Sequence, residues 1–249
     1  MNALIFAAGL GTRLRPLTDS CPKALVEVGG EPMLGRVIRR VVAAGVDRIV
    51  VNVHHFPDMV ADYLRRENDF GVDIRVSDER DCLLDTGGGL LKALPLFDDD
   101  EPILLHNADI LTDSPLRAQI EAHRESGACA TLLADARDSS RRLLFDGSMR
   151  MRGWARADFS EVRPAWLDVA GLEPLAFGGV HVVSRSVEPL LARYASVRGR
   201  VFSITDFYVE LCGHEVIRGF RPSESYRWYD IGRPASLAEA RAAVGAGML

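Results

Sequence analysis

The N-terminal segment joins a buried strand directly to a glycine loop. The apolar run 3–8 ends in Gly9-Leu10-Gly11-Thr12-Arg13, and Pro22-Lys23 follows shortly after. Glycines lack Cβ atoms, so backbone N–H groups can approach phosphate oxygens closely. Arg13 and Lys23 add fixed positive charge that backbone dipoles alone do not provide. The segment therefore predicts an α/β fold whose first strand ends at a polyphosphate site.

Two familiar phosphate loops do not fit this segment. The dinucleotide fingerprint requires a third glycine where this chain has Leu14, and an acidic residue ending the second strand, where it has Asn52. The Walker pattern requires Gly-Lys-Ser/Thr in one run, and Lys23 is too far from the glycines. A third interpretation is that the glycines only serve the backbone geometry of a strand and turn. It does not explain the Thr-Arg, Pro-Leu-Thr and Pro-Lys sequences that follow.

Strand and helix signals alternate along the chain, which predicts a mostly parallel sheet with helices on both faces. A hairpin with Asp-Gly in its turn is expected at 143–151, followed by an irregular segment at 152–174. The remaining strands are expected at 3–8, 48–53, 72–77, 102–107, 128–134, 175–183, 215–220 and 226–230. Helices are expected at 34–44, 57–67, 88–94, 116–126, 203–212 and 234–244.

Composition narrows the class of protein. With 249 residues, 47% of them apolar and 26% charged, the chain is long enough for a sizeable core. The net charge of −5 argues against a nucleic-acid binder. No apolar run is long enough for a membrane span, and no secretory signal precedes the first strand, so a cytoplasmic location is expected. The scattered cysteines predict reduced thiols and no metal site: Cys21, Cys82, Cys129 and Cys212.

Three further motifs carry chemistry. Asp85-Thr86-Gly87-Gly88-Gly89 predicts a bare backbone surface where a loop enters a helix, or simply a helix start with Thr86 as N-cap. Asn107-Ala108-Asp109 ends a buried strand, where a carboxylate is well placed to hold a divalent cation or to cap a turn. The third motif is Trp228-Tyr229-Asp230-Ile231-Gly232-Arg233-Pro234. The histidines show no ligand spacing and are interpreted as structural.

The N-terminal segment and these motifs resemble the signature of sugar-1-phosphate nucleotidylyltransferases. Among these, the chain is most similar to the single-domain N-acetylmuramate-1-phosphate uridylyltransferases. The resemblance implies a Rossmann-like fold of the nucleotide-diphospho-sugar transferase type. It implies one domain over 1–249, with a nucleotide-binding half over about 1–135 and a sugar-binding half over about 136–249. The C-terminal part shows no hexapeptide repeat, so an additional β-helix domain is not expected.

The same resemblance implies a set of site residues. Arg13 and Lys23 are the expected catalytic cations, and Asp109 and Asp230 the expected ligands of Mg²⁺, a hard ion that prefers oxygen. The expected sugar-phosphate contacts are Gly178 and Gly179. The expected nucleotide contacts, besides the two cations, are Ala8, Gly9, Gly11, Thr12, Glu79, Gly87, Gly88 and Asn107.

The implied reaction is in-line attack of a sugar 1-phosphate on the α-phosphorus of a nucleoside triphosphate, with release of pyrophosphate. The substrates are then the nucleotide, with UTP favoured, and a sugar 1-phosphate such as N-acetylmuramate 1-phosphate. The expected assembly is a monomer or small homo-oligomer, with no nucleic-acid or membrane partner. A carboxylate at Asp78 or Glu79 would suit cytosine or guanine better than uracil, so CTP and GTP stay open.

The chain also departs from the family pattern. Ala108 replaces a usual glycine, and Arg233 replaces a usual threonine. Arg152-Gly153-Trp154 stands where many relatives have a Glu-Lys-Pro that contacts hexose hydroxyls, so the usual contacts do not carry over from the resemblance. Trp154 and Trp166 are candidates for a sugar border or for the core. Asp206 is expected in a capped helix start, with a sugar-hydroxyl contact as the alternative.

Other functions stay open at this point. The same chemistry would serve a guanylyl- or cytidylyltransferase acting on a mannose or heptose phosphate or on phosphocholine. A regulatory relative that only senses nucleotide is a second class, although the chain keeps Lys23, Asp109 and Asp230. A glycosyltransferase would need an Asp-x-Asp metal motif, of which Asn107-Ala108-Asp109 provides half.

Overall fold

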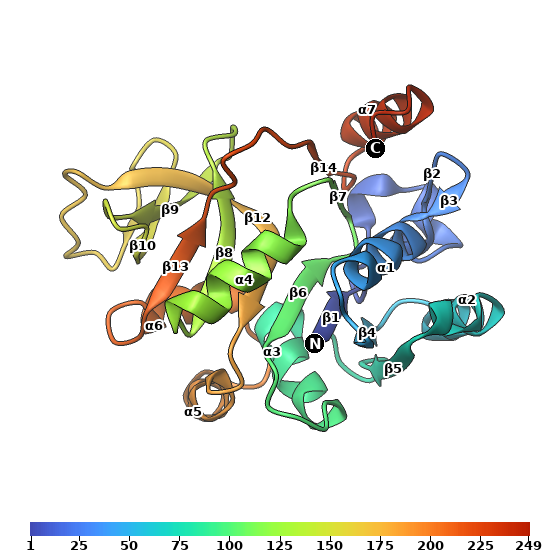
Figure 1. Ribbon diagram of the computed structural model, residues 1–249, viewed down its shortest axis with the longest axis horizontal. Coiled ribbons are helices and arrows are strands. Elements are labelled where there is room, and N and C mark those ends of the chain that lie inside the picture. The colour runs from blue at the N-terminus through green and yellow to red at the C-terminus, as the bar shows by residue number, and fades with distance from the viewer.

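A ten-stranded mixed sheet forms the centre of the protein in a computed structural model that describes residues 1–249 (Figure 1). Its main path runs β11-β10-β9-β12-β6-β1-β4-β5; β8 pairs with β12, and β13 pairs with β8. The strands are β1 (Asn2–Phe6), β4 (Arg48–Val53), β5 (Asp73–Asp78), β6 (Ile103–Asn107), β8 (Ala130–Asp135), β9 (Arg141–Phe145), β10 (Met151–Arg156), β11 (Val162–Arg163), β12 (Glu173–Val183) and β13 (Ile217–Phe220).

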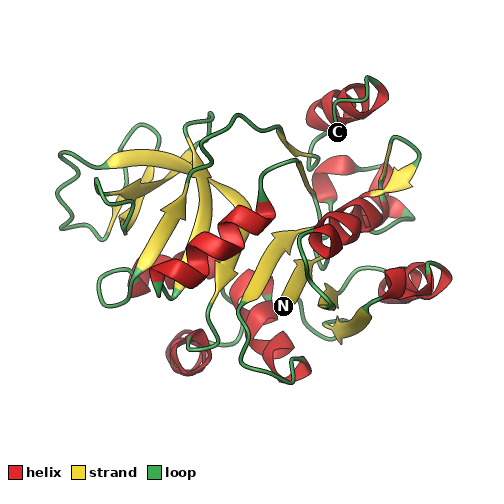
Figure 2. Ribbon diagram, viewed as in Figure 1, coloured by secondary structure: helices red, strands yellow, loops and turns green.

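The sheet is parallel in the first half of the chain. β1 pairs in parallel with β4 and β6, and β4 pairs in parallel with β5. The direction changes at β12, which is antiparallel to β6, β8 and β9. The expected parallel sheet is therefore confirmed for these strands, and the second half adds antiparallel strands at one end of it (Figure 2).

Helices cover both faces of the sheet, as expected. α1 (Met33–Ala43), α2 (Pro57–Arg66), α4 (Leu116–Ser126) and α7 (Pro234–Gly245) share one apolar core with one face of the sheet. α3 (Asp85–Ala93), α5 (Val187–Arg198) and α6 (Ile204–Leu211) share a second core with the other face. Successive strand residues point to opposite faces, so Ile5 enters the first core and Leu4 the second.

Two short ladders lie outside the main sheet. β7 (Ile110–Thr112) pairs antiparallel with β14 (Trp228–Asp230), and Asp230 lies opposite Ile110. The backbone N–H of Ile231 donates to the carbonyl of Asp109 at 3.0 Å. This ladder therefore places Asp230 beside Asp109 although the two are far apart in sequence. The second ladder joins β2 (Glu27–Val28) to β3 (Glu31–Pro32).

Several predicted elements match the structure closely. The strand at 48–53 and the helix at 116–126 have the predicted bounds. The latter helix ends at Gly127, whose φ of 58° is the left-handed conformation common after helices. Ser203 caps α6 by accepting a hydrogen bond from the Thr205 N–H at 3.2 Å.

Other predictions were wrong. The segment 152–174 is not irregular throughout, because β10 continues to Arg156 and pairs with β11. α3 begins at Asp85 rather than at residue 88, so Gly87 lies inside the helix together with Gly88 and Gly89. α5 was not predicted; it buries only Val187 and Leu191 and carries Pro189, which leaves a weak helical pattern in the sequence.

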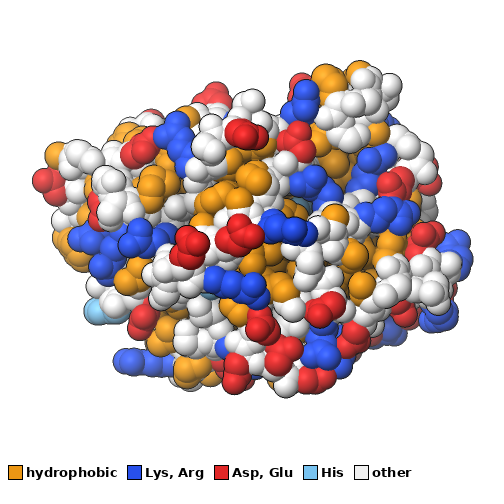
Figure 3. All heavy atoms as spheres, in the orientation of Figure 1, with side chains coloured by type: hydrophobic (Ala, Val, Ile, Leu, Met, Phe, Trp, Pro, Cys, Tyr) orange, Lys and Arg blue, Asp and Glu red, His pale blue; other side chains and the backbone are white.

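The surface on the face shown carries acidic and basic side chains interspersed with each other (Figure 3). None of the helices has the length and apolar character that crossing a bilayer requires.

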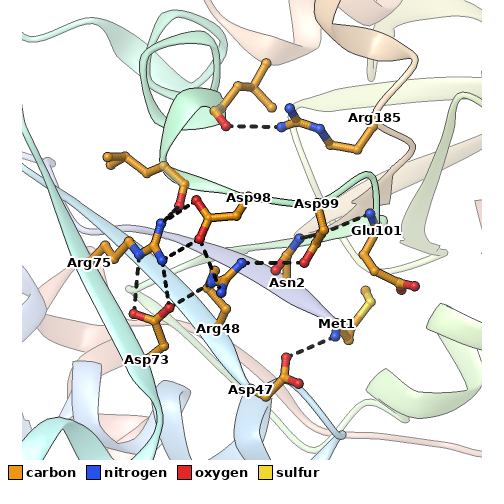
Figure 4. Close-up of polar contacts among 12 residues, drawn as sticks. Met1, Asn2, Asp47, Arg48, Asp73, Arg75, Asp98, Asp99, Glu101 and Arg185 are labelled. Carbon is orange, nitrogen blue, oxygen red and sulfur yellow. Dashed lines mark hydrogen bonds and ion pairs between the residues drawn. The ribbon is translucent and has the colours of Figure 1, made fainter.

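A network of arginine and aspartate side chains fastens the 94–101 loop to the sheet edge opposite the strand ends described below (Figure 4). Arg75 on β5 binds Asp98 at 2.7 Å and Asp73 at 3.1 Å. Arg48 on β4 binds Asp73 at 2.8 Å and also approaches Asp98 and Asp99. Hydrogen bonds from Arg48 lower the pKa of Asp73, and those from Arg75 lower the pKa of Asp98.

This network predicts a pH-dependent contribution to stability. A carboxyl with a lowered pKa in the folded state stabilises the fold above its unfolded pKa of about 3.9, and loses that effect as the pH falls. Arg75→Gln should therefore lower Tm by a few degrees at neutral pH and by less at about pH 3. Arg65→Gln, which removes an exposed pair with Asp62, is the control. If Arg75→Gln lowered Tm equally at both pH values, the prediction would be wrong.

Candidate active site

The predicted site residues gather at the carboxyl ends of four parallel strands. Phe6 at the end of β1 lies between Asn52 on β4 and Asn107 on β6, paired in register with both. β5 ends at Asp78, directly before Glu79. β12 brings Gly179 to the same edge, because Val180 pairs with His106. Ligands of open α/β sheets bind at such an edge.

A cavity of about 380 Å³ opens at this edge. The first strand and its loop line it with Phe6, Ala7, Ala8 and Gly9, and Leu83 and Val201 add apolar contacts. Its polar lining is Lys23, Asn52, Glu79, Asp85, Thr86, Asn107 and Asp109. A pocket with apolar walls and a few converging polar groups is typical of a nucleotide-sized ligand.

Asn52 and Glu79 form a buried pair in the wall of this cavity. Asn52 accepts from the Ala7 N–H at 2.8 Å and donates to Glu79 at 2.8 Å. The other Glu79 oxygen accepts from the Leu84 N–H at 3.1 Å. Burial raises the pKa of Glu79 above its ordinary value, although these hydrogen bonds oppose the rise. Both carboxylate oxygens of Glu79 are thus engaged with the protein.

The three glycines of α3 fit the helix against its neighbours. A Cβ at Gly87 would meet the Phe202 ring, and one at Gly88 would meet the Arg200 carbonyl. A Cβ at Gly89 would lie 2.9 Å from both Asn52 Nδ2 and Glu79 Oε1. Gly87 and Gly88 lie outside the cavity lining, where Asp85 and Thr86 take their place. Their nucleotide contact stays a prediction.

Lys23 and Asp109, which both line the cavity, form an ion pair. Lys23 begins a single 3-10 turn after Pro22, and its ammonium group bonds one Asp109 carboxylate oxygen. The side chains are 12% and 22% exposed, so the pair is largely shielded from water. Asp109 follows β6 immediately, and the Ala108 N–H is bonded to the Phe6 carbonyl at 3.1 Å. Strand pairing therefore fixes where the carboxylate lies.

Three of the four predicted charged residues converge around Gly232, and the fourth, Asp109, is joined to them through its ion pair with Lys23. A Cβ built on Gly232 would lie 2.7 Å from Asp230 Oδ1 and 2.9 Å from both Arg13 Nη2 and Lys23 Nζ. The Gly232 N–H also donates to Asp230 Oδ1 at 2.8 Å. Sequence reasoning missed Gly232 as a site residue. The signal was its place inside the Asp-x-Gly motif, but only the fold shows which side chains press on it.

Arg13 reaches this cluster from the glycine loop. Gly11 has a φ of 64°, and the Thr18 hydroxyl donates to its carbonyl at 2.8 Å. This turn leads into the 3-10 helix at Thr12–Leu14, in which Leu14 is buried and Arg13 exposed. Gly11 and Thr12 do not line the cavity, and their role in nucleotide binding stays a prediction.

The donor set suits a divalent cation with oxygen ligands. Asp109 already holds a cationic group, the Lys23 ammonium, and Asp230 lies next to it across the β7–β14 ladder. No third Asp, Glu, His or Cys joins them. Mg²⁺ commonly uses one or two carboxylates and completes its shell with water and substrate phosphates. The residues present therefore fit Mg²⁺ in the presence of a phosphate ligand.

A second cavity of about 850 Å³ adjoins the first, and Asn107 lines both. Asp230, Arg233 and Gly179 line the second cavity. Gly179 has a φ of 70° and a Cβ there would lie 2.9 Å from Asn107 Nδ2. Gly178 points elsewhere, since its Cβ would meet Leu133 at 2.7 Å. Asp109 and Asp230 thus lie where two cavities meet.

The structure separates the residues whose roles the sequence left open. Trp154 is 9% exposed and part of the second core, while Trp166 is 79% exposed. Asp206 lies in the first turn of α6, 3.3 Å from Arg163. Arg233 has no hydrogen bond or ion pair from its side chain and faces the second cavity. His106, His123 and His181 are buried, and burial lowers their pKa values to about 4, 4 and 3.

Residues 2–246 match the nucleotidyl transferase family. The chain belongs to this family. N-acetylmuramate α-1-phosphate uridylyltransferase from Caulobacter vibrioides is 33% identical over 97% of this chain and 96% of its own length. Mannose-1-phosphate guanyltransferase from Yarrowia lipolytica is 31% identical over 94% of this chain, which spans only 61% of that protein. The chain is thus a nucleotidyltransferase of the sugar-1-phosphate type, with uridylyl and guanylyl relatives.

Solved structures share the fold of this nucleotidyltransferase. HddC from Yersinia pseudotuberculosis, in complex with GMP-PN, has a TM-score of 0.76 at 20% identity and covers 98% of the chain. A UDP-glucose pyrophosphorylase in complex with UDP-glucose has a TM-score of 0.78 at 16% identity and covers 99%. At these identities the likeness establishes the nucleotide-diphospho-sugar transferase fold, as the sequence predicted.

Proposed function

We propose that this nucleotidyltransferase transfers UMP from UTP to N-acetylmuramate 1-phosphate and releases pyrophosphate. One observation carries the proposal: Lys23 and Asp109 line the smaller cavity, Asp230 lines the larger one, and Arg13 approaches Lys23 and Asp230 at Gly232. The smaller cavity would hold the nucleotide and the larger one the sugar phosphate. The full-length similarity to the uridylyltransferase from Caulobacter vibrioides supports this choice of substrates.

The reaction needs charge control rather than a general base. A phosphate oxygen of the sugar 1-phosphate forms a bond to the α-phosphorus, while the bond from that phosphorus to the bridging oxygen breaks and pyrophosphate leaves. Repulsion between two anions is the main obstacle. Asp109 and Asp230 would hold Mg²⁺, which supplies positive charge to both phosphates.

Lys23 and Arg13 would add positive charge from the protein itself. Lys23 would bind the α-phosphate region and would leave Asp109 when substrate and metal bind. Arg13 would bind the departing pyrophosphate. Such fixed cations stabilise developing charge without reorganising during the reaction.

A guanylyltransferase acting on mannose 1-phosphate is the second candidate. It is favoured by the 31% identity to the guanyltransferase from Yarrowia lipolytica over nearly the whole chain. The two candidates use the same carboxylates and cations and differ only in the base and the sugar.

One experiment separates these candidates. Pyrophosphate release is measured for UTP, CTP, GTP and dTTP, each against several sugar 1-phosphates, with Mg²⁺ and with EDTA. We expect Mg²⁺-dependent turnover of UTP with N-acetylmuramate 1-phosphate. Turnover of GTP with mannose 1-phosphate alone would favour the second candidate. No turnover by a folded protein that binds nucleotide would overturn both.

A further inference from the structure

A third cavity, of about 600 Å³, lies beside the two already described. It shares Asp85 with the nucleotide-side cavity and Ser139 and Phe177 with the 850 Å³ cavity. Substituents of a sugar held in the 850 Å³ cavity would therefore reach it. We call it the guanidinium cavity because Arg141, Arg142, Arg156 and Arg163 line it, together with Asp85, Glu161 and Asp206.

Two of these arginines lie directly opposite each other. Arg141 on β9 and Arg156 on β10 are register partners in the antiparallel pair, so their side chains emerge on the same face. Like charges in this position destabilise a sheet. Arg141 has no ion-pair partner, and Arg156 uses only its Nε, which bonds Glu161 at 3.1 Å. The terminal guanidinium nitrogens of both residues are thus free to bind an anion.

The neighbouring side chains hold this arrangement in place. Arg163 on β11 bonds Glu161 at 2.6 Å and Asp206 at 3.3 Å, which balances both carboxylates. Its guanidinium also stacks 5.1 Å above the Trp154 ring. Gly153 permits the close approach of β11, because a Cβ there would meet the Arg163 carbonyl. Glu161 and Asp206 are therefore already paired, while Arg141 has no ion pair and Asp85, shared with the nucleotide-side cavity, bonds only the Thr86 N–H and hydroxyl.

Two arginines line the 850 Å³ cavity itself, and of these Arg137 is engaged within the protein whereas Arg233 is not. Arg137 bonds Asp135 at 2.8 Å and the Phe177 carbonyl at its other nitrogen, and stacks 3.8 Å from the Trp228 ring. Its donors are thus largely used within the protein. Arg233 shares its cavity with the Asp230 carboxylate, whereas the guanidinium cavity sets two guanidinium groups with free nitrogens opposite each other. An additional negative charge on the sugar is therefore better matched by the guanidinium cavity.

We infer that the guanidinium cavity binds a carboxylate carried by the sugar of the sugar 1-phosphate, with Arg141 and Arg156 as its ligands. The inference rests on the proposed function, since it concerns the same substrate. It assigns the acidic substituent a place that neither the motifs nor the family match identifies. A carboxylate between the two guanidinium groups would also remove their mutual repulsion.

Two sugar phosphates test the inference directly. N-acetylmuramate 1-phosphate and N-acetylglucosamine 1-phosphate differ by a lactyl ether that carries a carboxylate. The protein should favour the acidic sugar at least roughly tenfold in kcat/KM. Arg141→Gln and Arg156→Gln should each raise KM for the acidic sugar roughly ten- to hundredfold, the value of a hydrogen bond to a charged group. Neither should change KM for UTP or turnover of the neutral sugar.

Arg198→Gln is the matched control. Arg198 is 57% exposed and bonds Glu210 at 3.0 Å, whereas Arg156 is 56% exposed and bonds Glu161 at 3.1 Å. The control should leave both sugars unaffected. Equal use of the two sugars, or equal losses on both in the variants, would overturn the inference while the proposed function stands. Absence of turnover with every sugar 1-phosphate would instead overturn the proposed function.

Discussion

Replacing Asp109 with asparagine is expected to lower kcat by about 10²- to 10³-fold while nucleotide binding persists. The amide keeps the size of the side chain but loses the charge that would hold Mg²⁺ and that now binds Lys23. Asp230→Asn should act in the same direction, because its carboxylate lies in the same cluster. Single-turnover pyrophosphate release, measured over a Mg²⁺ titration, should show a higher metal requirement in both variants.

Asp62→Asn provides the control for these two variants. Asp62 is exposed on α2 and pairs only with Arg65 at 2.7 Å. Its replacement should leave both the rate and the metal requirement unchanged. If Asp109→Asn and Asp230→Asn kept the original Mg²⁺ titration curve, the assignment of these residues to the metal would be wrong.

Gly232→Ala is expected to lower kcat by about 10²-fold with little change in Tm. The added methyl group would press on the ends of three charged side chains, those of Asp230, Arg13 and Lys23. Such side chains can move aside, so the fold loses little, but their displacement removes the geometry on which charge stabilisation depends. Thermal unfolding and steady-state kinetics, measured on the same preparation, separate the two effects.

Gly213→Ala is the matched control for this variant. Nothing lies within 4 Å of a Cβ at Gly213, and its φ lies outside the left-handed region. The control should keep both rate and Tm. If Gly232→Ala lost thermal stability together with its activity, Gly232 would serve the fold rather than the cluster of charges.

The sequence predicted the parallel strands and the edge at which they end, because each strand is a local apolar run. The resemblance to the family pointed to Arg13, Lys23, Asp109 and Asp230 as one group, and of these only Asp109 directly follows one of the parallel strands. The convergence of Arg13, Lys23 and Asp230 on Gly232 depends on contacts between segments far apart in the chain. No local pattern reports such contacts.

The glycine run of α3 is a second feature whose contacts the local sequence does not determine. A backbone free of Cβ atoms serves equally well for contact with a ligand and for contact with another segment. The structure shows Gly87, Gly88 and Gly89 against Phe202, Arg200 and the Asn52–Glu79 pair. Likewise, the opposition of Arg141 and Arg156 follows from hairpin register, which the expected hairpin at 143–151 did not extend far enough to include.

The short β7–β14 ladder makes the proposed reaction depend on the pairing of two segments that are far apart in the chain. Asp230 arrives from the C-terminal segment, and α7 behind it bonds the Glu27 carbonyl through Arg241 at 2.9 and 3.0 Å. Asp230 thus supplies a carboxylate to a centre whose other parts come from the first strand, its loop and the end of β6. Asp230 lies beyond the loop that joins β13 to β14. We therefore expect that cleavage of this loop abolishes activity.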